Sequence, residues 1–439
     1  MILPNVTKMC NNGTVARITI IGTGYVGLTT GVCLNYLGHD VICTDVNWNK
    51  IINLSKGRVS IHEDQLHELV NEGISKKTLS FTNDIDGAVA LADFVFLCLP
   101  TPEKPDGSAD MSYIETASKD IKEHLNPDAV VVIKSTVLVG TSQSVEELLG
   151  NSVVSNPEFL REGTAVSDFF HPDRIVIGAS NMNAAHAVAL LYDKLDTEFV
   201  FSNTRTAELI KYTSNAFLAT KLSFMNAMAL ICERVGADVD DLIEGIGHDP
   251  RIGNMFLQPS PAWGGSCFPK DTKALLSIAK DCNYDFKLLQ AAIDTNDEQI
   301  KQVISKIEMA HGDALCDATV TILGLTFKAN TDDLRQSPAL RIVDKLLELG
   351  VKVRAWDPTV EDKTDSELIP EGIEICVSPL VASMGADVLV ITTEWYELTK
   401  LDASEVAQLM KKKAVVDTRN ILPVDKWLDE DFDYQGIGR

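Results

Sequence analysis

The chain has 439 residues, of which 45% are hydrophobic and 23% charged, a balance typical of globular proteins, and it is too long for one hydrophobic core. Its formal net charge of −24, from 39 basic and 63 acidic residues, excludes nucleic acid and anionic membrane surfaces as general partners, because the protein repels them. The nine cysteines are odd in number and form no C-x-x-C pair, which favours a reducing cytoplasm and gives no support for a structural metal site.

The first 16 residues lack the apolar core of a signal peptide, so we predict a short disordered leader. No apolar run approaches the roughly 20 residues that cross a bilayer, so we expect no membrane segment. Both observations favour a cytoplasmic protein.

Apolar runs alternate with helical stretches in the first part of the chain. The run Arg17–Gly22 ends in glycine and predicts a buried parallel strand, followed by a helix to Leu37. Further strands are predicted at His39–Asp45, Ala92–Leu99 and Ala129–Lys134. This alternation predicts an α/β fold with a doubly wound parallel sheet.

The C-terminal third repeats the plan in the same order. Four apolar runs match the four predicted strands, namely Val320–Gly324, Gly350–Asp357, Ala386–Thr392 and Ala414–Asp417. The second copy has Gly324-Leu-Thr-Phe-Lys328 where the first has three glycines. We infer a second Rossmann-like sheet that has lost dinucleotide binding and is free to hold another nucleotide.

Residues 204 to about 247 lie between the two copies and are rich in helix formers, with no glycine or proline before Gly236. They predict one long helix. A helix that bridges two α/β domains is a natural place for a dimer contact and for one wall of the cleft between the domains. We therefore predict two Rossmann-like domains, 1–200 and 306–439, joined by this helix and a small helical domain that together span 201–305.

A dinucleotide fingerprint, Gly22-Thr-Gly24-Tyr-Val-Gly27, follows the first predicted strand and opens a helix. Gly24 lets a pyrophosphate approach the backbone, and the helix N-terminus supplies donors. Asp45 ends the second strand, where a carboxylate binds the adenosine ribose and repels a 2′-phosphate, so NAD is preferred to NADP. The alternative is a glycine-rich turn without a ligand.

The octapeptide Gly-Gly-Ser-Cys-Phe-Pro-Lys-Asp, residues 264–271, places Cys267 among glycines and charges. A nicotinamide cofactor takes hydride from an alcohol, and a thiol can then add to the aldehyde and carry a second oxidation through a thioester. Fingerprint and cysteine together predict a four-electron oxidation of an alcohol to an acid. The alternative is that Cys267 is a buried small hydrophobe.

Other polar residues are candidates for the same chemistry. Lys211 and Asn215 are spaced i, i+4 and suit a developing oxyanion, although a solvated surface lysine fits the spacing equally well. Glu158 and Glu162 could act as bases or orient water, or lie on an exposed helix. Asp271 could hold a water or tune the thiolate, or simply start a helix.

The motifs closely resemble those of the nucleotide-sugar 6-dehydrogenases, the UDP-glucose/GDP-mannose dehydrogenase family. The resemblance spans nearly the whole chain and rests on the segments 21–28, 134–137, 155–165, 251–256, 264–271, 324–339, 392–395 and 436–439, with the helix that carries Lys211 and Asn215.

The resemblance assigns roles residue by residue. The positions that match catalytic residues are Cys267, Lys211, Asn215, Asp271, Glu158 and Thr136. Those that match cofactor-binding residues are Gly22, Gly24, Tyr25, Val26, Gly27, Asp45, Lys50, Thr101, Thr136, Glu162, Lys270 and Arg335. Those that match substrate-binding residues are Glu158, Phe159, Leu160, Glu162, Lys211, Asn215, Arg251, Phe256, Gly264, Phe327 and Lys328, with Arg251 reaching the sugar of a partner subunit.

Two segments depart from the family pattern. The family commonly has Pro-x-x-Glu-Pro-Gly-Leu where this chain has Ser60-Ile-His-Glu-Asp-Gln-Leu66, which bears on the cofactor loop. Aromatic-glycine variants usually precede the cysteine loop, where this chain has Pro261-Ala-Trp263, which bears on the sugar pocket.

The resemblance implies an NAD-dependent oxidation of UDP-glucose to UDP-glucuronate by a homodimer or dimer-based oligomer. The same chemistry on GDP-mannose or a UDP-N-acetylhexosamine is the alternative within the family. A non-catalytic nucleotide-sugar binding protein is the alternative outside it, which the presence of Cys267, Lys211, Asn215 and Asp271 disfavours.

Overall fold

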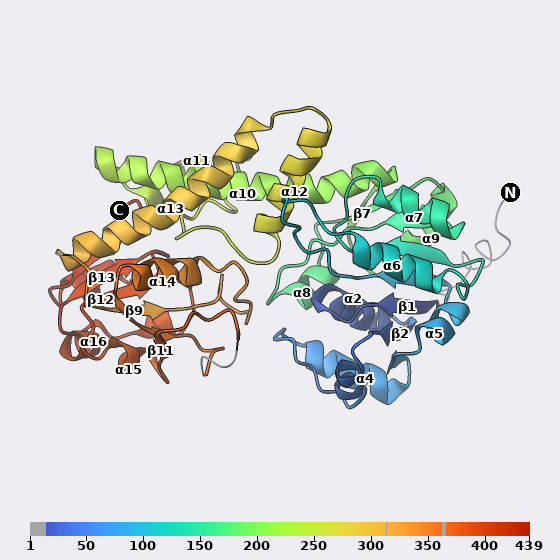
Figure 1. Cartoon of the computed structure of the whole chain (residues 1–439), viewed down its shortest axis with the longest axis horizontal. Helices are drawn as coiled ribbons and strands as arrows, with labels where there is room; N and C mark the ends of the chain where they lie inside the picture. Colours follow the sequence, from blue (N-terminus) through green and yellow to red (C-terminus); the bar gives the residue numbers. More distant parts are fainter. Residues whose placement is uncertain (1–14, 313, 362–365) are drawn as a thin grey trace. The chain divides into compact units, whose positions relative to one another are not determined.

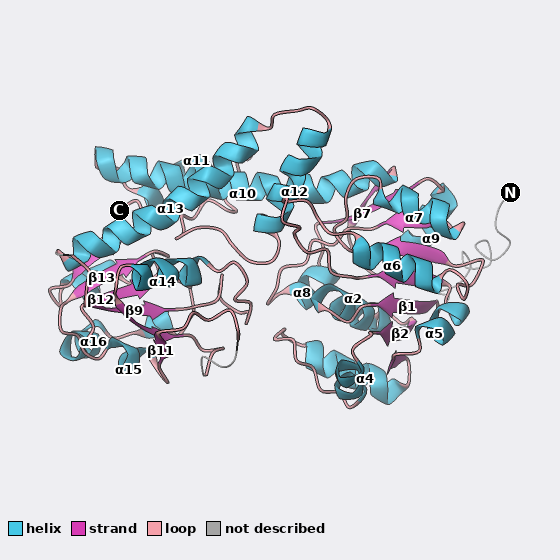
Figure 2. Cartoon of the chain, viewed as in Figure 1, coloured by secondary structure: helices cyan, strands magenta, loops and turns pink. Residues whose placement is uncertain are grey.

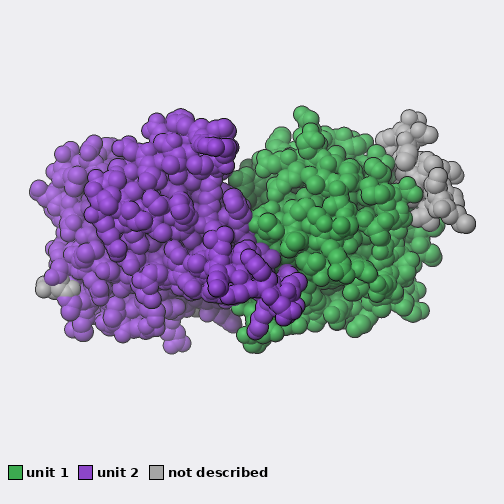
Figure 3. All heavy atoms as spheres, turned by 90° about the horizontal axis from the view of Figure 1, so that it is seen from above, with its two compact units in different colours: residues 1–214 green, residues 215–439 purple. Residues whose placement is uncertain are grey.

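A computed structural model of the chain describes residues 15–312, 314–361 and 366–439 (Figure 1). Most of the predicted leader, with Cys10, lies outside the described residues. The chain divides into two compact units, residues 1–214 and 215–439, which Figure 3 colours separately. Each unit contains one sheet.

The sheet of the first unit, whose strands are magenta in Figure 2, has the strand order β3-β2-β1-β4-β5-β6-β7-β8. Its strands are β1 (Arg17–Ile21), β2 (Asp40–Thr44), β3 (Leu79–Thr82), β4 (Phe94–Leu97), β5 (Val130–Ile133), β6 (Val153–Ser155), β7 (Arg174–Ala179) and β8 (Glu198–Ser202). The four strands predicted here are β1, β2, β4 and β5, which are adjacent in the sheet. All neighbours are parallel except β6 and β7, where Val154 pairs with Ala179 in antiparallel register.

Helices follow most of these strands. They are α2 (Tyr25–Tyr36), α3 (Trp48–Ser55), α4 (Leu66–Lys76), α5 (Ile85–Leu91), α6 (Ser112–Ile121), α7 (Thr141–Leu149), α8 (Ala165–Phe170) and α9 (Met182–Leu190). Ile18 and Ile20 of β1 are buried in a core with Leu28 and Val32 of α2. Burial of these β-branched and aliphatic side chains holds α2 against β1, the strand that precedes it.

The sheet of the second unit has the order β11-β10-β9-β12-β13-β14. Its strands are β9 (Thr319–Leu323), β10 (Lys352–Trp356), β11 (Ile373–Ile375), β12 (Val388–Ile391), β13 (Ala414–Asp417) and β14 (Asp433–Gly436). Counted from its own first strand, each sheet begins with the same order, 3-2-1-4-5-6. The predicted duplication is therefore confirmed.

The second sheet has a hydrophobic core on each face. Successive residues of β12 alternate between them, so Val388 and Val390 belong to one core and Leu389 and Ile391 to the other. Full burial on both faces explains why these strands are continuous apolar runs in the sequence. The elements beside this sheet are α14 (Pro338–Glu348), α15 (Pro379–Ser383), η2 (Leu398–Lys400), α16 (Ala403–Leu409) and α17 (Val424–Leu428).

The segment between the sheets is helical. It contains α10 (Thr204–Val235), α11 (Val239–Gly247), α12 (Phe268–Asp281) and α13 (Lys287–His311). The predicted helix over 204–247 is thus two helices. Gly236, with φ of 74°, ends α10, because glycine adopts this left-handed conformation at a helix C-terminus without steric cost.

By length and composition alone, α10 is long and apolar enough to cross a membrane. Two of its polar side chains, however, are hydrogen-bonded inside the second unit: Ser223 Oγ donates to the carbonyl of Ala292 at 2.6 Å, and Asn226 Oδ1 accepts the N–H of Ser260 at 2.8 Å. We therefore assign α10 to the protein core.

Candidate active site

The glycine loop joins β1 to α2. Gly22 has φ of 96°, and a Cβ there would lie 2.5 Å from the carbonyl oxygen of Cys98. A Cβ on Gly27 would lie 1.9 Å from the carbonyl oxygen of Gly22, so α2 packs directly on the loop. Nothing lies within 4 Å of a Cβ built on Gly24. The loop therefore fits a dinucleotide, with Gly24 open to the pyrophosphate beside the backbone N–H groups of Tyr25 and Val26 in the first turn of α2.

Asp45 directly follows β2 and is tied to this loop. Its Oδ2 accepts the N–H of Thr23 at 3.0 Å and the Thr23 hydroxyl at 2.7 Å, and Lys50 Nζ of α3 lies 3.6 Å away. Burial raises the pKa of Asp45, but the hydrogen bonds from Asn47 and Thr23 outweigh it and hold the pKa below its usual value. The ionised carboxylate is suited to accept hydrogen bonds from ribose hydroxyls.

Thr101 and Thr136 lie beyond the carboxyl ends of β4 and β5, where open α/β sheets bind ligands. Thr101 is buried and Thr136 half-buried. Ser135 joins the two loops, because its hydroxyl donates to the carbonyl of Leu99 and accepts the N–H of Leu99, both at 2.7 Å.

Glu158 lies between β6 and α8 in a buried charge cluster. Its Oε1 accepts a hydrogen bond from Lys211 Nζ at 2.8 Å, and the side chains of the pair are 8% and 5% exposed. Burial raises the pKa of Glu158, but the charge of Lys211 outweighs it, so the pKa lies below its usual value. Lys134 is also buried, which lowers the pKa of its ammonium group to about 8, and its Nζ donates to Asn156 Oδ1 at 3.0 Å. The cluster holds Glu158 as a carboxylate.

Phe159, Leu160 and Glu162 belong to the same segment. The guanidinium of Arg174, the first residue of β7, lies 3.7 Å from the centre of the Phe159 ring, and Lys211 Nζ lies 5.3 Å from it. The N–H of Leu160 donates to Glu158 Oε2 at 2.6 Å. This segment is therefore held by side chains of β7 and α10 as well as by its own backbone.

Cys267 is the N-cap residue of α12 and is half-buried. Asp271, in the first turn, is completely buried, and its Oδ2 accepts Asn215 Nδ2 at 2.6 Å while Oδ1 accepts Lys270 Nζ at 2.5 Å. Ser266 Oγ lies 3.6 Å from Cys267 Sγ. Asp271 therefore lies in the first turn of a helix that begins at Phe268, and it binds Asn215. A thiol at a helix N-terminus is placed where a thiolate is stabilised.

The cysteine loop packs against the loop that follows β9. A Cβ on Gly264 would lie 2.1 Å from the carbonyl oxygen of Gln336, and one on Gly265 would lie 2.8 Å from the Phe327 ring. Lys328 Nζ lies 5.7 Å from the centre of that ring. The second unit thus brings Phe327 against the loop that carries Cys267, and Lys328 follows Phe327 in the chain.

Three further candidates lie on loops. Arg251 is 87% exposed at its side chain and donates to Asp249, with Nη2 to Oδ2 at 2.6 Å. Phe256 has a positive φ of 61°, and its ring centre lies 6.4 Å from that of Phe268. Arg335 donates to Asp333 at 2.7 Å and has an exposed side chain.

Each unit therefore gathers its own part of the candidate set. The first unit joins Glu158 to Lys211 and the glycine loop to Asp45. The second unit joins Cys267 to Asp271 through one turn of α12, and Asp271 to Asn215. Arg251 and Arg335 bind acidic neighbours of their own loops.

The two departures from the family pattern have clear structural positions. In the first, Glu63 keeps the family's glutamate and is buried, whereas Gln65 has φ of 63° where the family pattern has glycine. In the second, the buried indole of Trp263 donates to Ser223 Oγ at 2.8 Å, and its backbone N–H donates to Asn296 Oδ1 at 2.8 Å. Trp263 therefore anchors the start of the cysteine loop to α10 and α13.

Four further residues contribute to these contacts without having been predicted individually from the sequence, namely Glu63, Lys134, Asn156 and Arg174. Lys134 and Asn156 lie in the family motifs at 134–137 and 155–165. Glu63 matches the family's glutamate in Ser60–Leu66. The sequence therefore contained a motif that pointed to each of these three residues. Arg174 had none, because only the antiparallel course of β7 brings its first residue to Phe159.

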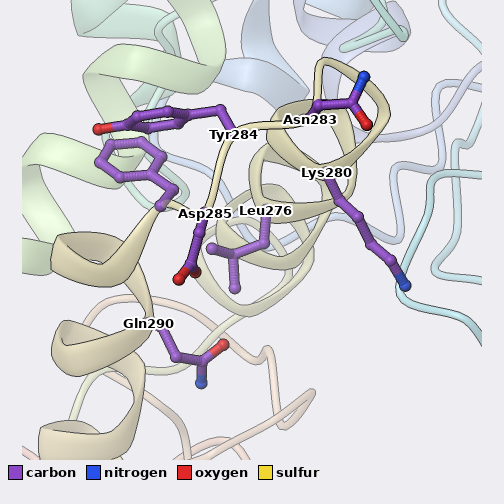
Figure 4. A pocket seen from close by; sticks show the side chains of 7 residues that line it. Leu276, Lys280, Asn283, Tyr284, Asp285 and Gln290 are labelled. Atoms are coloured by element: carbon purple, nitrogen blue, oxygen red, sulfur yellow. The ribbon is translucent and has the colours of Figure 1, made fainter.

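A surface pocket of about 470 Å³ lies between the end of α12 and the start of α13 (Figure 4). It is lined by Leu276, Lys280, Asn283, Tyr284, Asp285, Phe286 and Gln290. Cys267 caps the opposite end of α12, whose 14 residues span about 20 Å, so this pocket is not the site of the cysteine. Across the described parts of the chain, no group of three or more His, Cys, Asp or Glu side chains is arranged to hold a metal ion.

Models of one family match three successive parts of the chain. The NAD binding domain of the UDP-glucose/GDP-mannose dehydrogenase family matches residues 16–196, its central domain matches 205–298, and its UDP binding domain matches 321–424. The dinucleotide loop therefore belongs to an NAD-binding domain.

Relatives that match over their full length support the same family. The chain is 43% identical to the UDP-glucose 6-dehydrogenase of Rhizobium meliloti, over 96% of this chain and 99% of that one. It is 41% identical to UDP-glucose 6-dehydrogenase TuaD of Bacillus subtilis, over 96% and 93%. A solved UDP-glucose dehydrogenase from Pyrobaculum islandicum is 35% identical, with a TM-score of 0.90 over 98% of this chain and 99% of that one. The chain belongs to the UDP-glucose/GDP-mannose dehydrogenase family of NAD-dependent oxidoreductases.

Proposed function

We propose that this protein oxidises the primary alcohol of UDP-glucose to the carboxylate of UDP-glucuronate, with two NAD molecules consumed per sugar. NAD supplies the hydride acceptor for both oxidations. The thiolate of Cys267 adds to the carbon of the aldehyde, and the aldehyde oxygen takes up a proton to give a thiohemiacetal. Loss of the second hydride and of that proton leaves a thioester, and water then cleaves its C–S bond and returns the thiol.

The residues of the second unit have defined parts in this proposal. Asn215 donates a hydrogen bond to the developing oxyanion, and Asp271 handles water and protons beside Cys267. Phe256, Gly264, Phe327 and Lys328 contact the UDP-sugar, while Lys270 and Arg335 contact NAD. The single observation that carries the proposal is the arrangement at α12, where Cys267 caps the helix and the buried Asp271 one turn later binds Asn215 at 2.6 Å.

The residues of the first unit bind NAD and prepare the hydrolysis. Gly22, Gly24, Tyr25, Val26, Gly27, Asp45, Lys50 and Thr101 contact the cofactor. Lys211 stabilises the oxyanion, and Glu158 and Thr136 assist the attack of water on the thioester. Phe159, Leu160 and Glu162 line the sugar. The buried Glu158–Lys211 pair supports these roles, because it holds a carboxylate and a cation together in one place.

Exhaustive turnover of UDP-glucose by the purified protein tests the proposal. We expect two NADH per sugar and a uronic acid as product. Cys267→Ala is expected to abolish steady acid formation, because no thioester forms, although slow aldehyde chemistry can survive. Near wild-type uronate formation by Cys267→Ala would contradict the covalent route.

A panel of nucleotide sugars separates the alternatives. NADH release with GDP-mannose or a UDP-N-acetylhexosamine in preference to UDP-glucose would assign the same chemistry to another substrate. Binding of UDP-glucose without any NADH release would indicate a non-catalytic binding protein. The full-length relatives named above support UDP-glucose.

We also propose that the protein is a homodimer or dimer-based oligomer in the cytoplasm. Phe217, Phe224 and Ile231 of α10 recur every seven residues and are 69%, 58% and 48% exposed, so they form an apolar stripe along the helix. Pairing with α10 of a second copy would cover this stripe in a two-fold interface. Residues 201–305 are then the dimerisation domain, between an NAD-binding domain at 1–200 and a UDP-sugar domain at 306–439.

A further inference from the structure

The Glu63 carboxylate joins three segments of the first unit. Its Oε2 accepts the backbone N–H of Gly163 at 2.8 Å and also bonds the Tyr25 hydroxyl, and its Oε1 accepts the N–H of Val166 at 3.2 Å. The N–H of Gly163 also donates to the Tyr25 hydroxyl oxygen at 2.7 Å. Glu63 is only 9% exposed, so its hydrogen bonds are shielded from water.

The hydrogen-bond partners of Glu63 belong to the proposed cofactor site and to the proposed substrate site. Tyr25 is the first residue of α2 and follows Gly24 of the dinucleotide loop. Gly163 directly follows Glu162 of the substrate segment, and its φ of 83° suits the glycine found there. Glu63 is thus a direct link between the loop that fits NAD and the segment proposed to line the sugar.

The hydrogen bond between the Tyr25 phenol and the Glu63 carboxylate is strengthened by the charge on Glu63. Burial and the neighbouring Glu63 carboxylate both raise the pKa of Tyr25, so the phenol keeps its proton and donates to Glu63. Hydrogen bonds that involve an ionised partner are stronger than neutral ones, and removing one partner from a buried set leaves the others unsatisfied.

The substrate segment is also internally braced, so a displacement at Gly163 extends to its neighbours. Arg161 donates through Nε and Nη2 to both carboxylate oxygens of Asp168, at 3.1 Å and 2.5 Å. Glu158, at the other end of the segment, is bound to Lys211. The hydrogen bonds of Glu63 and Tyr25 to Gly163 connect this braced segment to the dinucleotide loop.

We propose that Glu63 is a positioning residue that couples the binding of NAD to the binding of UDP-glucose. A ligand seated at Tyr25 orders the substrate segment through the hydrogen bonds that Tyr25, Glu63 and Gly163 make with one another, and a sugar held by that segment orders Tyr25 in return. The second ligand then binds a site that is already ordered, and such coupling is reciprocal. This inference rests on the proposed function.

Fluorescence titration of NADH, with and without saturating UDP-glucose, tests the coupling, because this ligand pair cannot react. In the wild-type protein we expect UDP-glucose to tighten NADH binding by about five-fold or more. Glu63→Gln, which removes the charge but keeps the shape, is expected to reduce this factor to below about two-fold. Tyr25→Phe is expected to reduce it at least as much, because it removes the bonds of Tyr25 to both Glu63 and Gly163. The affinity for each ligand alone is expected to change less than the coupling.

The matched control is Asp64→Asn, which removes the same charge from the exposed neighbour of Glu63 and is expected to keep wild-type coupling. Coupling that survives in both Glu63→Gln and Tyr25→Phe would overturn the inference, as would wild-type protein that binds both ligands independently. Failure of wild-type protein to bind UDP-glucose at all would instead contradict the proposed function. Since Tyr25→Phe removes one hydroxyl group only, it provides a readout even if Glu63→Gln does not fold.

Discussion

Asp45 and Asp357 occupy the same position in the two sheets, but their carboxylates have different surroundings. Each directly follows the last residue of its strand, and these last residues, Thr44 and Trp356, pair with the ends of β1 and β9. The Asp45 side chain is 15% exposed and accepts hydrogen bonds from Thr23. Asp357 is 2% exposed overall. Its Oδ2 accepts the N–H groups of Leu325 and Thr326 and the indole N–H of Trp395, at 2.7, 3.1 and 3.0 Å. One copy keeps a partly exposed carboxylate, and the other buries it and uses it to hold its own loops together.

Asp45→Ala is expected to weaken NAD binding and to narrow the preference over NADP. It removes a ribose contact and the repulsion of a 2′-phosphate, together on the order of 2–3 kcal/mol. Titrations of NADH and NADPH by fluorescence measure both effects. Unchanged affinities for both cofactors would show that Asp45 does not meet the ribose.

Asp357→Ala is expected to destabilise the second unit by about 3 kcal/mol, because it leaves the buried donors of Leu325, Thr326 and Trp395 without an acceptor. The measurement is the midpoint of urea unfolding, followed by a probe in that unit. NADH affinity is expected to stay at the wild-type value, in contrast to Asp45→Ala. A variant as stable as the wild type would show that the loops hold without this carboxylate.

Lys134 gives the stability a predicted pH dependence. Burial lowers its pKa from 10.5 to about 8 in the native state. Below pH 8 both states carry the proton, and the native state bears the full cost of the buried charge. Between pH 8 and 10.5 the unfolded chain keeps a proton that the native protein has lost, so stability rises with pH through this window, by about 3 kcal/mol in total.

Urea unfolding of Lys134→Met beside the wild type isolates this effect. The unfolding free energy of the wild type is expected to rise relative to that of Lys134→Met between pH 8 and 10.5. All other titratable groups are shared by the two proteins, so the change in this difference reports on Lys134. Lys119→Met, at an exposed position on α6, is the matched control and is expected to leave the difference flat. A flat difference for Lys134→Met as well would contradict the lowered pKa.

Gly438→Ala is expected to disturb the corner between α10 and α11. A Cβ there would lie 2.6 Å from Cβ of Val239 and 2.9 Å from Cβ of Ala229. Gly236→Ala is the control, because Gly236 has nearly the same φ, 74° against 76°, but nothing lies within 4 Å of its added Cβ. We expect Gly438→Ala to cost about 1–3 kcal/mol more than Gly236→Ala in thermal or urea unfolding. Equal losses would attribute the whole effect to backbone strain.

Arg251 is proposed to reach the sugar of a partner subunit, and mixed variants test this. Arg251→Ala and Cys267→Ala are each expected to be inactive alone, whereas hybrid dimers regain one functional site of two. Subunit exchange is verified with differently tagged chains before activity is measured. If exchange occurs and no activity returns, Arg251 acts within its own chain.

Several strands and two functional loops of this structure were predictable from the local sequence. Buried parallel strands are continuous apolar runs, so β1, β2, β4 and β5 and their later copies were predictable, and their order revealed the duplication. The glycine loop was predictable because Gly22 and Gly27 meet constraints of the local backbone. The cysteine loop was recognisable from its motif, although the motif alone places no partner beside Cys267.

The partners of the candidate residues were decided by the tertiary structure. Glu158 meets Lys211 across 53 residues of sequence, and Glu63 meets Gly163 across 100. Such pairs leave no periodic trace, because a carboxylate is satisfied by any donor that the fold brings to it, backbone N–H groups included. The sequence by itself therefore determined the two sheets and identified the chemical groups. Only the packing of loops at the strand ends decided which of those groups are buried, charged and joined to one another.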